Sequence, residues 1–177
     1  MRPAVFLDRD GVLNRVVPRD GRPGSPRTPA EFVLCADAAA ALDRLRHAGY
    51  LLFVVTNQPD VARGLLAPED LDTMMRTLAA ALPVDDARIC RHDDDDGCAC
   101  RKPRHGMITD LAAAWAVDLP ASFMVGDGWR DIAAGRAAGC RTVLLRRAYN
   151  ADVRADYAAD TLIEAAELIL AAGRPGG

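Results

Sequence analysis

The stretch that decides the fold lies near the start of the chain, at residues 4–14, and reads AVFLDRDGVLN. Its first four residues are all apolar, which is typical of a strand buried on both faces of a sheet. An acidic turn, Asp8-Arg9-Asp10-Gly11, follows at once. Aspartate and glycine are common turn residues. We therefore predict a buried strand that runs into a loop carrying two carboxylates.

Apolar segments like this one alternate with helical patterns along the rest of the chain. Further strands are expected at residues 51–55, 87–90, 122–125 and 142–145, and helices at 36–47, from Pro68 onward, at 107–116, 131–138 and 161–172. Such alternation predicts right-handed βαβ units. The expected fold is α/β, a Rossmann-like three-layer sandwich with a mainly parallel central sheet and no large cap domain. Residues 15–29 are expected to be a loop, and residues 173–177 a frayed tail.

Length and composition set the protein class. The chain has 177 residues, half of them apolar, which fits one globular domain over residues 1–177. A net charge of −3 argues against a nucleic-acid partner. Its longest apolar runs are far below the roughly 18 residues that span a bilayer. We expect a monomeric cytoplasmic protein without a membrane partner.

Polar residues follow the carboxyl ends of four apolar segments. In an open α/β sheet, ligands bind in the crevice at these ends. The residues expected to converge there are Asp8, Asp10, Thr56, Asn57, Lys102, Asp127 and Asp131. Three carboxylates this close together require protons or a cation, and hard oxygen ligands suit Mg²⁺. Since Lys102, Thr56 and Asn57 are hydrogen-bond donors, the pocket suits a phosphoryl group, which an aspartate can attack to form an aspartyl-phosphate.

Four short motifs, in order, resemble those of the haloacid dehalogenase-like hydrolase superfamily. They read FLDRDGVLN at residues 6–14, VTNQ at 55–58, RKP at 101–103 and GDGWRD at 126–131. More narrowly, they resemble the branch that holds D-glycero-D-manno-heptose-1,7-bisphosphate 7-phosphatases and histidinol-phosphate phosphatases. The resemblance spans residues 4–145. It implies a Mg²⁺-dependent phosphomonoesterase that acts through an aspartyl-phosphate on a small phosphorylated metabolite.

The resemblance also implies a role for each motif residue. Asp8 is the nucleophile, and Asp10 is the general acid and then the base. Mg²⁺ is held by the Asp8 carboxylate, the Asp10 backbone carbonyl and Asp127. Asp131 lies one shell out, and the alternative is that it only caps the helix that it starts. The remaining expected contacts are Thr56 and Lys102 with the transferring phosphoryl group, and Asn14, Asn57, Gln58, Arg101 and Gly128 with the substrate.

A second cluster suits zinc. The chain has five cysteines, and three of them lie with a histidine in one short segment, as Cys90, His92, Cys98 and Cys100. Three thiolates and one imidazole form a common structural Zn²⁺ site. A similar spacing occurs in the heptose-phosphatase branch, just before its Arg-Lys-Pro motif. The zinc-stapled loop, about residues 90–100, would fix the direction of Arg101 and Lys102. The alternative is a set of thiols without metal, the state expected for Cys35 and Cys140.

The sequence predicts the type of reaction more closely than it predicts the substrate. The resemblance favours heptose 1,7-bisphosphate as substrate, with histidinol phosphate or another sugar phosphate as alternatives. Arginines 15, 19, 22 and 27 could bind a second phosphate or lie on the surface. Arg104 and His105 are expected in an exposed turn, Trp129 in packing, and the acidic run 93–96 at a solvated loop tip.

Two other classes remain open. Cys98 and Arg104 stand at the Cys-x5-Arg spacing of thiol-dependent phosphatases, although Pro103 removes an N–H that such a loop needs. The chain could also be a non-catalytic zinc-stapled binding module.

Overall fold

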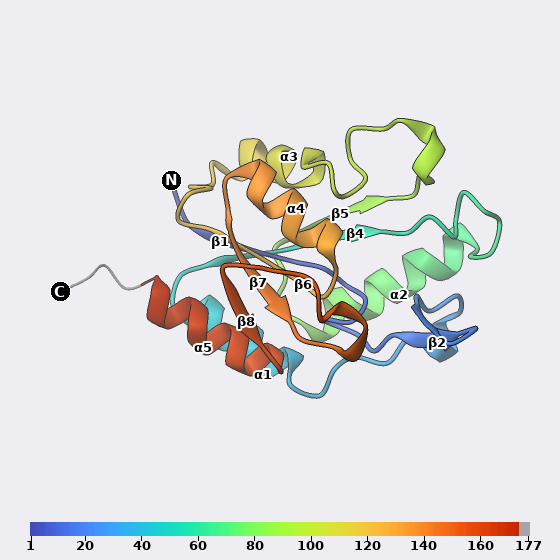
Figure 1. Ribbon diagram of the computed structural model, residues 1–177, viewed down its shortest axis with the longest axis horizontal. Helices are drawn as coiled ribbons and strands as arrows, with labels where there is room; N and C mark the ends of the chain where they lie inside the picture. Colours follow the sequence, from blue (N-terminus) through green and yellow to red (C-terminus); the bar gives the residue numbers. More distant parts are fainter. Residues whose placement is uncertain (174–177) are drawn as a thin grey trace.

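A parallel β-sheet forms the centre of the molecule. The computed structural model describes residues 1–173 and shows six strands in the order β5-β4-β1-β6-β7-β8 (Figure 1). The strands are β1 (Ala4–Leu7), β4 (Leu51–Asn57), β5 (Asp86–Cys90), β6 (Phe123–Gly126), β7 (Arg141–Leu145) and β8 (Tyr157–Ala159). Every neighbouring pair in this sheet is parallel. The expected α/β fold with a parallel sheet is confirmed.

Helices cover both faces of the sheet. They are α1 (Ala38–His47), α2 (Pro68–Ala81), α3 (Gly106–Trp115), α4 (Trp129–Ala138) and α5 (Leu162–Ala172), with short 3-10 turns η1 (Pro29–Glu31), η2 (Asp94–Asp96) and η3 (Ala148–Asn150). Helices α1 and α5 lie on one face and α3 and α4 on the other (Figure 1). None of the helices in residues 1–173 is long and apolar enough to cross a membrane.

Each face of the sheet has its own hydrophobic core. Val5 and Leu7 of β1 pack in the core beneath α1 and α5. Ala4 and Phe6, which alternate with them, pack in the core beneath α3 and α4. Strand β4 divides its side chains in the same way. Because both faces are buried, the strand sequences show no polar alternation, which explains the unbroken apolar runs.

Several features differ from the sequence prediction. Helix α1 begins at Ala38, two residues after its predicted start, and β4 continues through Thr56 and Asn57, which were expected to follow it. Strand β8 was not expected, and α4 begins at Trp129, two residues before the predicted start. The expected loop at 15–29 contains an antiparallel hairpin of β2 (Val17–Arg19) and β3 (Arg22–Gly24). Its turn, Asp20-Gly21, has φ angles of 49° and 72°, as a type I′ turn requires. Most of the expected frayed tail lies outside the described residues.

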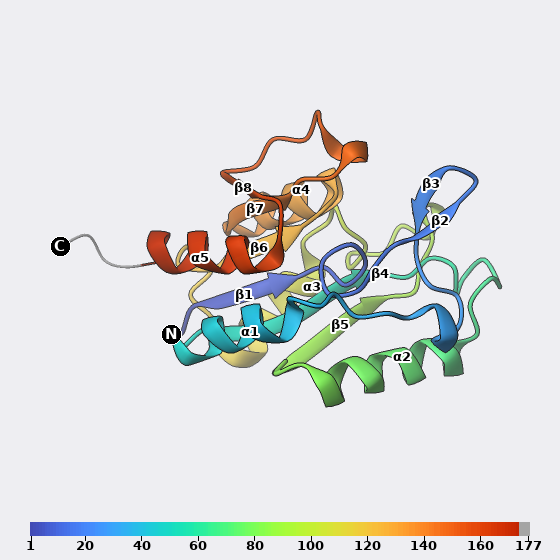
Figure 2. The same ribbon diagram turned by 90° about the horizontal axis from the view of Figure 1, so that it is seen from below.

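The topology places one end of β1 at a switch point. From β1 the chain moves outward to β4 and β5, and then returns to the other side of β1 as β6. The carboxyl ends of β1 and β6 therefore open into a crevice of the kind that binds ligands in α/β proteins. The β2–β3 hairpin projects from the layered body on the side of the molecule away from the N-terminus (Figure 2).

A substitution at Phe53 tests the assignment of the core beneath α3 and α4. It is fully buried, and its ring centroid lies 5.5 Å from those of Phe6 and Trp115. We expect Phe53→Ala to lower the free energy of unfolding by about 3–5 kcal/mol, because it leaves a cavity between the two remaining aromatic rings. Urea denaturation measures this change. Leu65→Ala, at an exposed site, is the control and should stay within about 0.5 kcal/mol of the parent. A similar loss in both variants would contradict the assignment of the core.

Candidate active site

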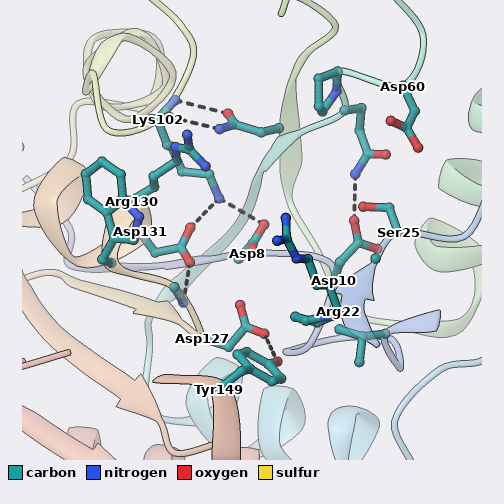
Figure 3. Close-up of a pocket in the computed structure, with 18 of the residues that line it drawn as sticks. Asp8, Asp10, Arg22, Ser25, Asp60, Lys102, Asp127, Arg130, Asp131 and Tyr149 are labelled. Atoms are coloured by element: carbon teal, nitrogen blue, oxygen red, sulfur yellow. Dashed lines mark hydrogen bonds and ion pairs between the residues drawn. The ribbon is translucent and has the colours of Figure 1, made fainter. Parts of the chain in front are cut away.

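Three carboxylates from distant parts of the sequence meet at the switch point. Asp8 follows β1, Asp127 follows β6, and Asp131 lies in the first turn of α4. One oxygen of each lies within 4.8 Å of the others (Figure 3). Two glycines permit this approach. A Cβ on Gly11, whose φ is 81°, would lie 1.9 Å from Asp127 Oδ2, and one on Gly126 would lie 2.1 Å from Asp131 Cβ.

A buried lysine lies between two of these carboxylates. Lys102 Nζ is 2.9 Å from Asp8 Oδ1 and 2.6 Å from Asp131 Oδ1 (Figure 3). It also donates to the carbonyl of Val55 at 2.7 Å. Asn57 fixes the backbone of Lys102, because its side chain accepts from the lysine N–H and donates to the lysine carbonyl, both at 3.0 Å. Lys102 is therefore fixed both at its backbone and at its ammonium group.

The carboxylates are not fully neutralised by this lysine. Burial and the charge of Asp131 raise the pKa of Asp8 to about 8, against the opposing effect of Lys102. Burial and Asp131 raise the pKa of Asp127 to about 6, although the hydroxyl of Tyr149 works the other way. Burial alone would lower the pKa of Lys102, but Asp131 and Asp8 hold it above its ordinary value. Three carboxylates beside one ammonium leave an excess of negative charge that a divalent cation would balance.

The donor set fits magnesium. Its ligand oxygens lie about 2.0–2.1 Å from the ion, so that they are about 3 Å apart when adjacent and about 4 Å apart when opposite. Carboxylate oxygens within 4.8 Å can adopt this arrangement with small rotations. Both oxygens of Asp131 are already engaged, one by Lys102 and the other by the N–H of Gly128 at 2.9 Å. Asp8 and Asp127 are therefore better placed than Asp131 to hold the ion directly.

Asp10 is held by a buried network. Arg9 donates to both of its oxygens at 3.1 Å, Asn14 donates to Oδ1 at 2.9 Å, and Gln58 donates to Oδ2 at 2.8 Å. Gln58 also donates to the hydroxyl of Thr56 at 2.9 Å. Arg9 is fully buried. No role for Arg9 was predicted from the sequence, because its contacts with Asp10 and Gln58 depend on how the loops pack.

Most of the predicted site residues line one cavity of about 550 Å³. These are Asp8, Asp10, Asn57, Gln58, Arg101, Lys102, Asp127, Gly128 and Asp131. Asn14 and Thr56, in contrast, are fully buried and lie behind this lining, where they contact Asp10 and Gln58. Trp129, expected in packing, is 54% exposed and lines the cavity, so that expectation was wrong.

Six arginines belong to the cavity lining. They are Arg19, Arg22, Arg27, Arg63, Arg101 and Arg130, whereas Arg15, Arg104 and His105 are not in the lining. Several are paired with carboxylates: Arg27 lies 2.7 Å from Asp60, and Arg101 lies 2.8 Å from Asp94. The acidic run at 93–96 is therefore not simply a solvated tip, because Asp94 faces the cavity.

The loop after β7 also reaches the site, and no motif marks it. Tyr149 donates a hydrogen bond to Asp127 Oδ2 (Figure 3), and Asn150 donates to the backbone carbonyl of Asp127 at 2.8 Å. Both residues line the cavity. The strand order could have indicated this contact, because β7 neighbours β6, but the sequence gives no distance between their loops.

The four candidate zinc ligands come together. Cys90 Sγ lies 3.7 Å from Cys98 Sγ and 3.6 Å from His92 Nδ1. Cys100 Sγ lies 3.4 Å from Cys98 Sγ and 3.3 Å from His92 Nδ1. A tetrahedral Zn²⁺ with bonds of about 2.0–2.3 Å places its ligands about 3.5–3.8 Å apart. The cluster therefore fits zinc. In contrast, Cys35 and Cys140 are free thiols away from the cluster.

Known proteins match both the sequence and the fold. A family model described as HAD-hydrolase-like matches residues 99–165. A D-glycero-beta-D-manno-heptose-1,7-bisphosphate 7-phosphatase of Rhodopseudomonas palustris is 39% identical over 78% of this chain and 80% of its own. A D-glycero-alpha-D-manno-heptose-1,7-bisphosphate 7-phosphatase of Mycobacterium tuberculosis is 35% identical over 90% of this chain and 87% of its own.

A solved structure agrees with these sequence matches. It is the D,D-heptose 1,7-bisphosphate phosphatase of B. bronchiseptica in complex with magnesium and phosphate. It superposes with a TM-score of 0.82 and 32% identity, and covers 96% of this chain and 99% of its own. At this level of identity the likeness extends beyond the fold.

Removal of one thiolate tests the zinc cluster. We expect Cys98→Ser to reduce bound zinc well below one per chain, because serine is a poor zinc ligand. Zinc binding contributes about 10–16 kcal/mol in small peptides, so residues 90–102 should lose protection from amide hydrogen exchange. Metal analysis and hydrogen exchange measure the two effects. Cys35→Ser is the control and should keep both. Full zinc content in the Cys98 variant would contradict the ligand assignment.

The raised carboxyl pKa values predict how stability depends on pH. Asp8 and Asp127 have ordinary values of 3.8 and folded values of about 8 and 6. Between the ordinary and the folded pKa of each group, the folded state binds more protons than the unfolded state, so the stability of the folded state falls as pH rises. We expect the melting temperature of magnesium-free, zinc-loaded protein to decrease from pH 5 to pH 8.

Saturating Mg²⁺ should flatten this decrease, because the cation takes the place of the proton. Asp8→Asn should also weaken it, since asparagine does not titrate. Thermal melts with and without Mg²⁺ at each pH give the comparison. A parent protein whose magnesium-free melting temperature rises over this range would show that these carboxylates are not the destabilising groups.

Proposed function

Because the chain belongs to the haloacid dehalogenase-like hydrolases, and within them to the family that contains the heptose-1,7-bisphosphate 7-phosphatases, we propose that it hydrolyses a phosphate monoester through an aspartyl-phosphate on Asp8. One observation carries the proposal. Asp8 Oδ1 is held by Lys102 Nζ at 2.9 Å and by the N–H of Arg9 at 2.8 Å. The carboxylate is thus fixed in direction, and Oδ2 is left to form a bond to phosphorus.

In the first step, Asp8 Oδ2 attacks the phosphorus atom and the bond from phosphorus to the alcohol oxygen breaks. Asp10 gives its proton to this leaving oxygen. Lys102 stays charged beside Asp8 and stabilises the negative charge of the phosphoryl oxygens. Asp8 through Oδ1, Asp127 and the Asp10 backbone carbonyl would hold Mg²⁺, which would supply the positive charge that lets a carboxylate approach a phosphate dianion.

In the second step, water attacks the phosphorus of the aspartyl-phosphate, and Asp10 accepts the proton of this water. The products are inorganic phosphate and the regenerated Asp8 carboxylate. Each oxygen of Asp10 accepts two hydrogen bonds in this structure. Proton transfer at either oxygen therefore requires one of these bonds to open. Arg9, Asn14 and Gln58 in this way set the position from which Asp10 acts.

The substrate we propose is a D-glycero-D-manno-heptose 1,7-bisphosphate, cleaved at its 7-phosphate. The relatives named above carry this activity in their names, for both the alpha and the beta anomer. The six arginines of the cavity lining also suit a second phosphate, since arginine binds phosphate through two parallel hydrogen bonds and a phosphate can compete with the carboxylates that pair with several of them. Histidinol phosphate and other sugar phosphates are the alternatives. The single domain over residues 1–177, the monomeric state and the cytoplasmic location stay predictions.

Loss of the nucleophile tests the reaction. We expect Asp8→Asn to lower kcat roughly 10⁴-fold or more, the scale seen when an enzyme loses its nucleophile. Steady-state turnover of an aryl phosphate, with and without Mg²⁺, measures this. Asp110→Asn, at an exposed position on α3, is the matched control and should retain parent activity. Turnover that survives Asp8→Asn and needs no Mg²⁺ would favour the thiol mechanism at Cys98.

A substrate panel tests the second half of the proposal. It contains both heptose 1,7-bisphosphate anomers, the corresponding 7-monophosphate and histidinol phosphate. A bisphosphate should give the highest kcat/KM, because its second phosphate meets the arginines. Preference for histidinol phosphate would overturn the substrate and leave the phosphatase intact. No turnover of any compound, with metals present, would favour the zinc-stapled binding module.

A further inference from the structure

The loop that follows β7 contacts both halves of the candidate active site. Arg147 donates to the backbone carbonyl of Gly11 at 3.0 Å, in the loop that carries Asp8 and Asp10. Tyr149 donates to Asp127 Oδ2, and Asn150 to the Asp127 carbonyl at 2.8 Å. Three of four successive residues therefore hold active-site loops. None of them belongs to the motifs that the proposed mechanism uses.

Asp127 is fixed by this loop at two points. The side chain of Asn150 is buried and also donates to the carbonyl of Leu145 at 2.8 Å, so that it ties the end of β7 to the backbone of Asp127. Tyr149 fixes the side chain. With Oδ2 of Asp127 engaged by the phenol, Oδ1 is the oxygen left for a cation.

Tyr149 also lies against the glycine that the first loop requires. A Cβ on Gly11 would lie 1.9 Å from Asp127 Oδ2 and 3.3 Å from the Tyr149 hydroxyl. The carboxylate, the phenol and the backbone of Gly11 therefore form one close contact. Yet the side chain of Tyr149 is 44% exposed overall. Core packing alone does not account for where its hydroxyl lies.

We propose that Tyr149 is a positioning residue for the magnesium site, which orients the Asp127 carboxylate and thereby sets the affinity of the site for Mg²⁺. The inference rests on the proposed function in one respect, that Asp127 is a magnesium ligand. A carboxylate already held in the binding orientation loses less conformational freedom when the ion arrives. Removal of such an outer partner costs metal sites about 10–100-fold in affinity.

Tyr149→Phe removes the hydroxyl and keeps the aromatic ring, so it tests the contribution of the hydroxyl alone. Isothermal titration of zinc-loaded protein with Mg²⁺, in the absence of substrate, should give a dissociation constant at least about tenfold weaker than that of the parent. Tyr157→Phe is the matched control. Tyr157 lies on β8, where its ring packs against Phe123 at 6.2 Å between centroids, and its loss of a hydroxyl should leave Mg²⁺ binding unchanged.

Kinetics separate positioning from substrate contact, because Tyr149 also lines the cavity. If Tyr149 orients Asp127, the Mg²⁺ concentration for half-maximal activity rises with the dissociation constant, and saturating Mg²⁺ restores kcat with little change in the substrate KM. A higher substrate KM with unchanged Mg²⁺ binding would overturn the proposal and make Tyr149 a substrate contact. A parent protein that binds no Mg²⁺ would overturn the metal site itself, and with it the proposed function.

Discussion

The site depends on a buried cluster of three charges, in which the ammonium of Lys102 lies between the carboxylates of Asp8 and Asp131. Lys102 thus connects the loop after β1 with the first turn of α4. The lysine itself lies two residues after Cys100, the last of the candidate zinc ligands. One ammonium cannot balance these carboxylates together with Asp127. The excess negative charge lowers the stability of the folded protein without a bound cation and favours the binding of a divalent cation, so the same electrostatic imbalance affects both stability and metal binding.

Two devices keep Lys102 in place despite this imbalance. Asn57 hydrogen-bonds to both backbone groups of the lysine at 3.0 Å. Cys100, two residues earlier, belongs to the cluster whose geometry fits zinc. The free energy of a structural zinc site is comparable with the stability of a whole domain. A zinc ion held by this cluster would therefore add local rigidity to the segment that leads into Lys102.

The sequence was sufficient for five of the six strands of the central sheet and for the motif carboxylates. Runs such as residues 4–7 are buried on both faces, so their apolar character follows directly from the fold. It was not sufficient for Arg9 or Tyr149, because their roles depend on distances between loops that only the packed strands determine. The β2–β3 hairpin was missed for another reason. Its prolines and arginines suggest a loop, and the Asp20-Gly21 turn was the only positive signal.

The charged side chains that line the cavity influence which anions bind there. Arg27 and Arg101 are paired with Asp60 and Asp94, at 2.7 and 2.8 Å. An incoming anion must compete with these carboxylates for the guanidinium groups. A phosphate dianion carries more charge than a carboxylate and offers more acceptor oxygens, so it competes for these guanidinium groups better than a carboxylate does. The carboxylates of Asp60 and Asp94 therefore weaken the binding of singly charged anions more than the binding of a phosphate group.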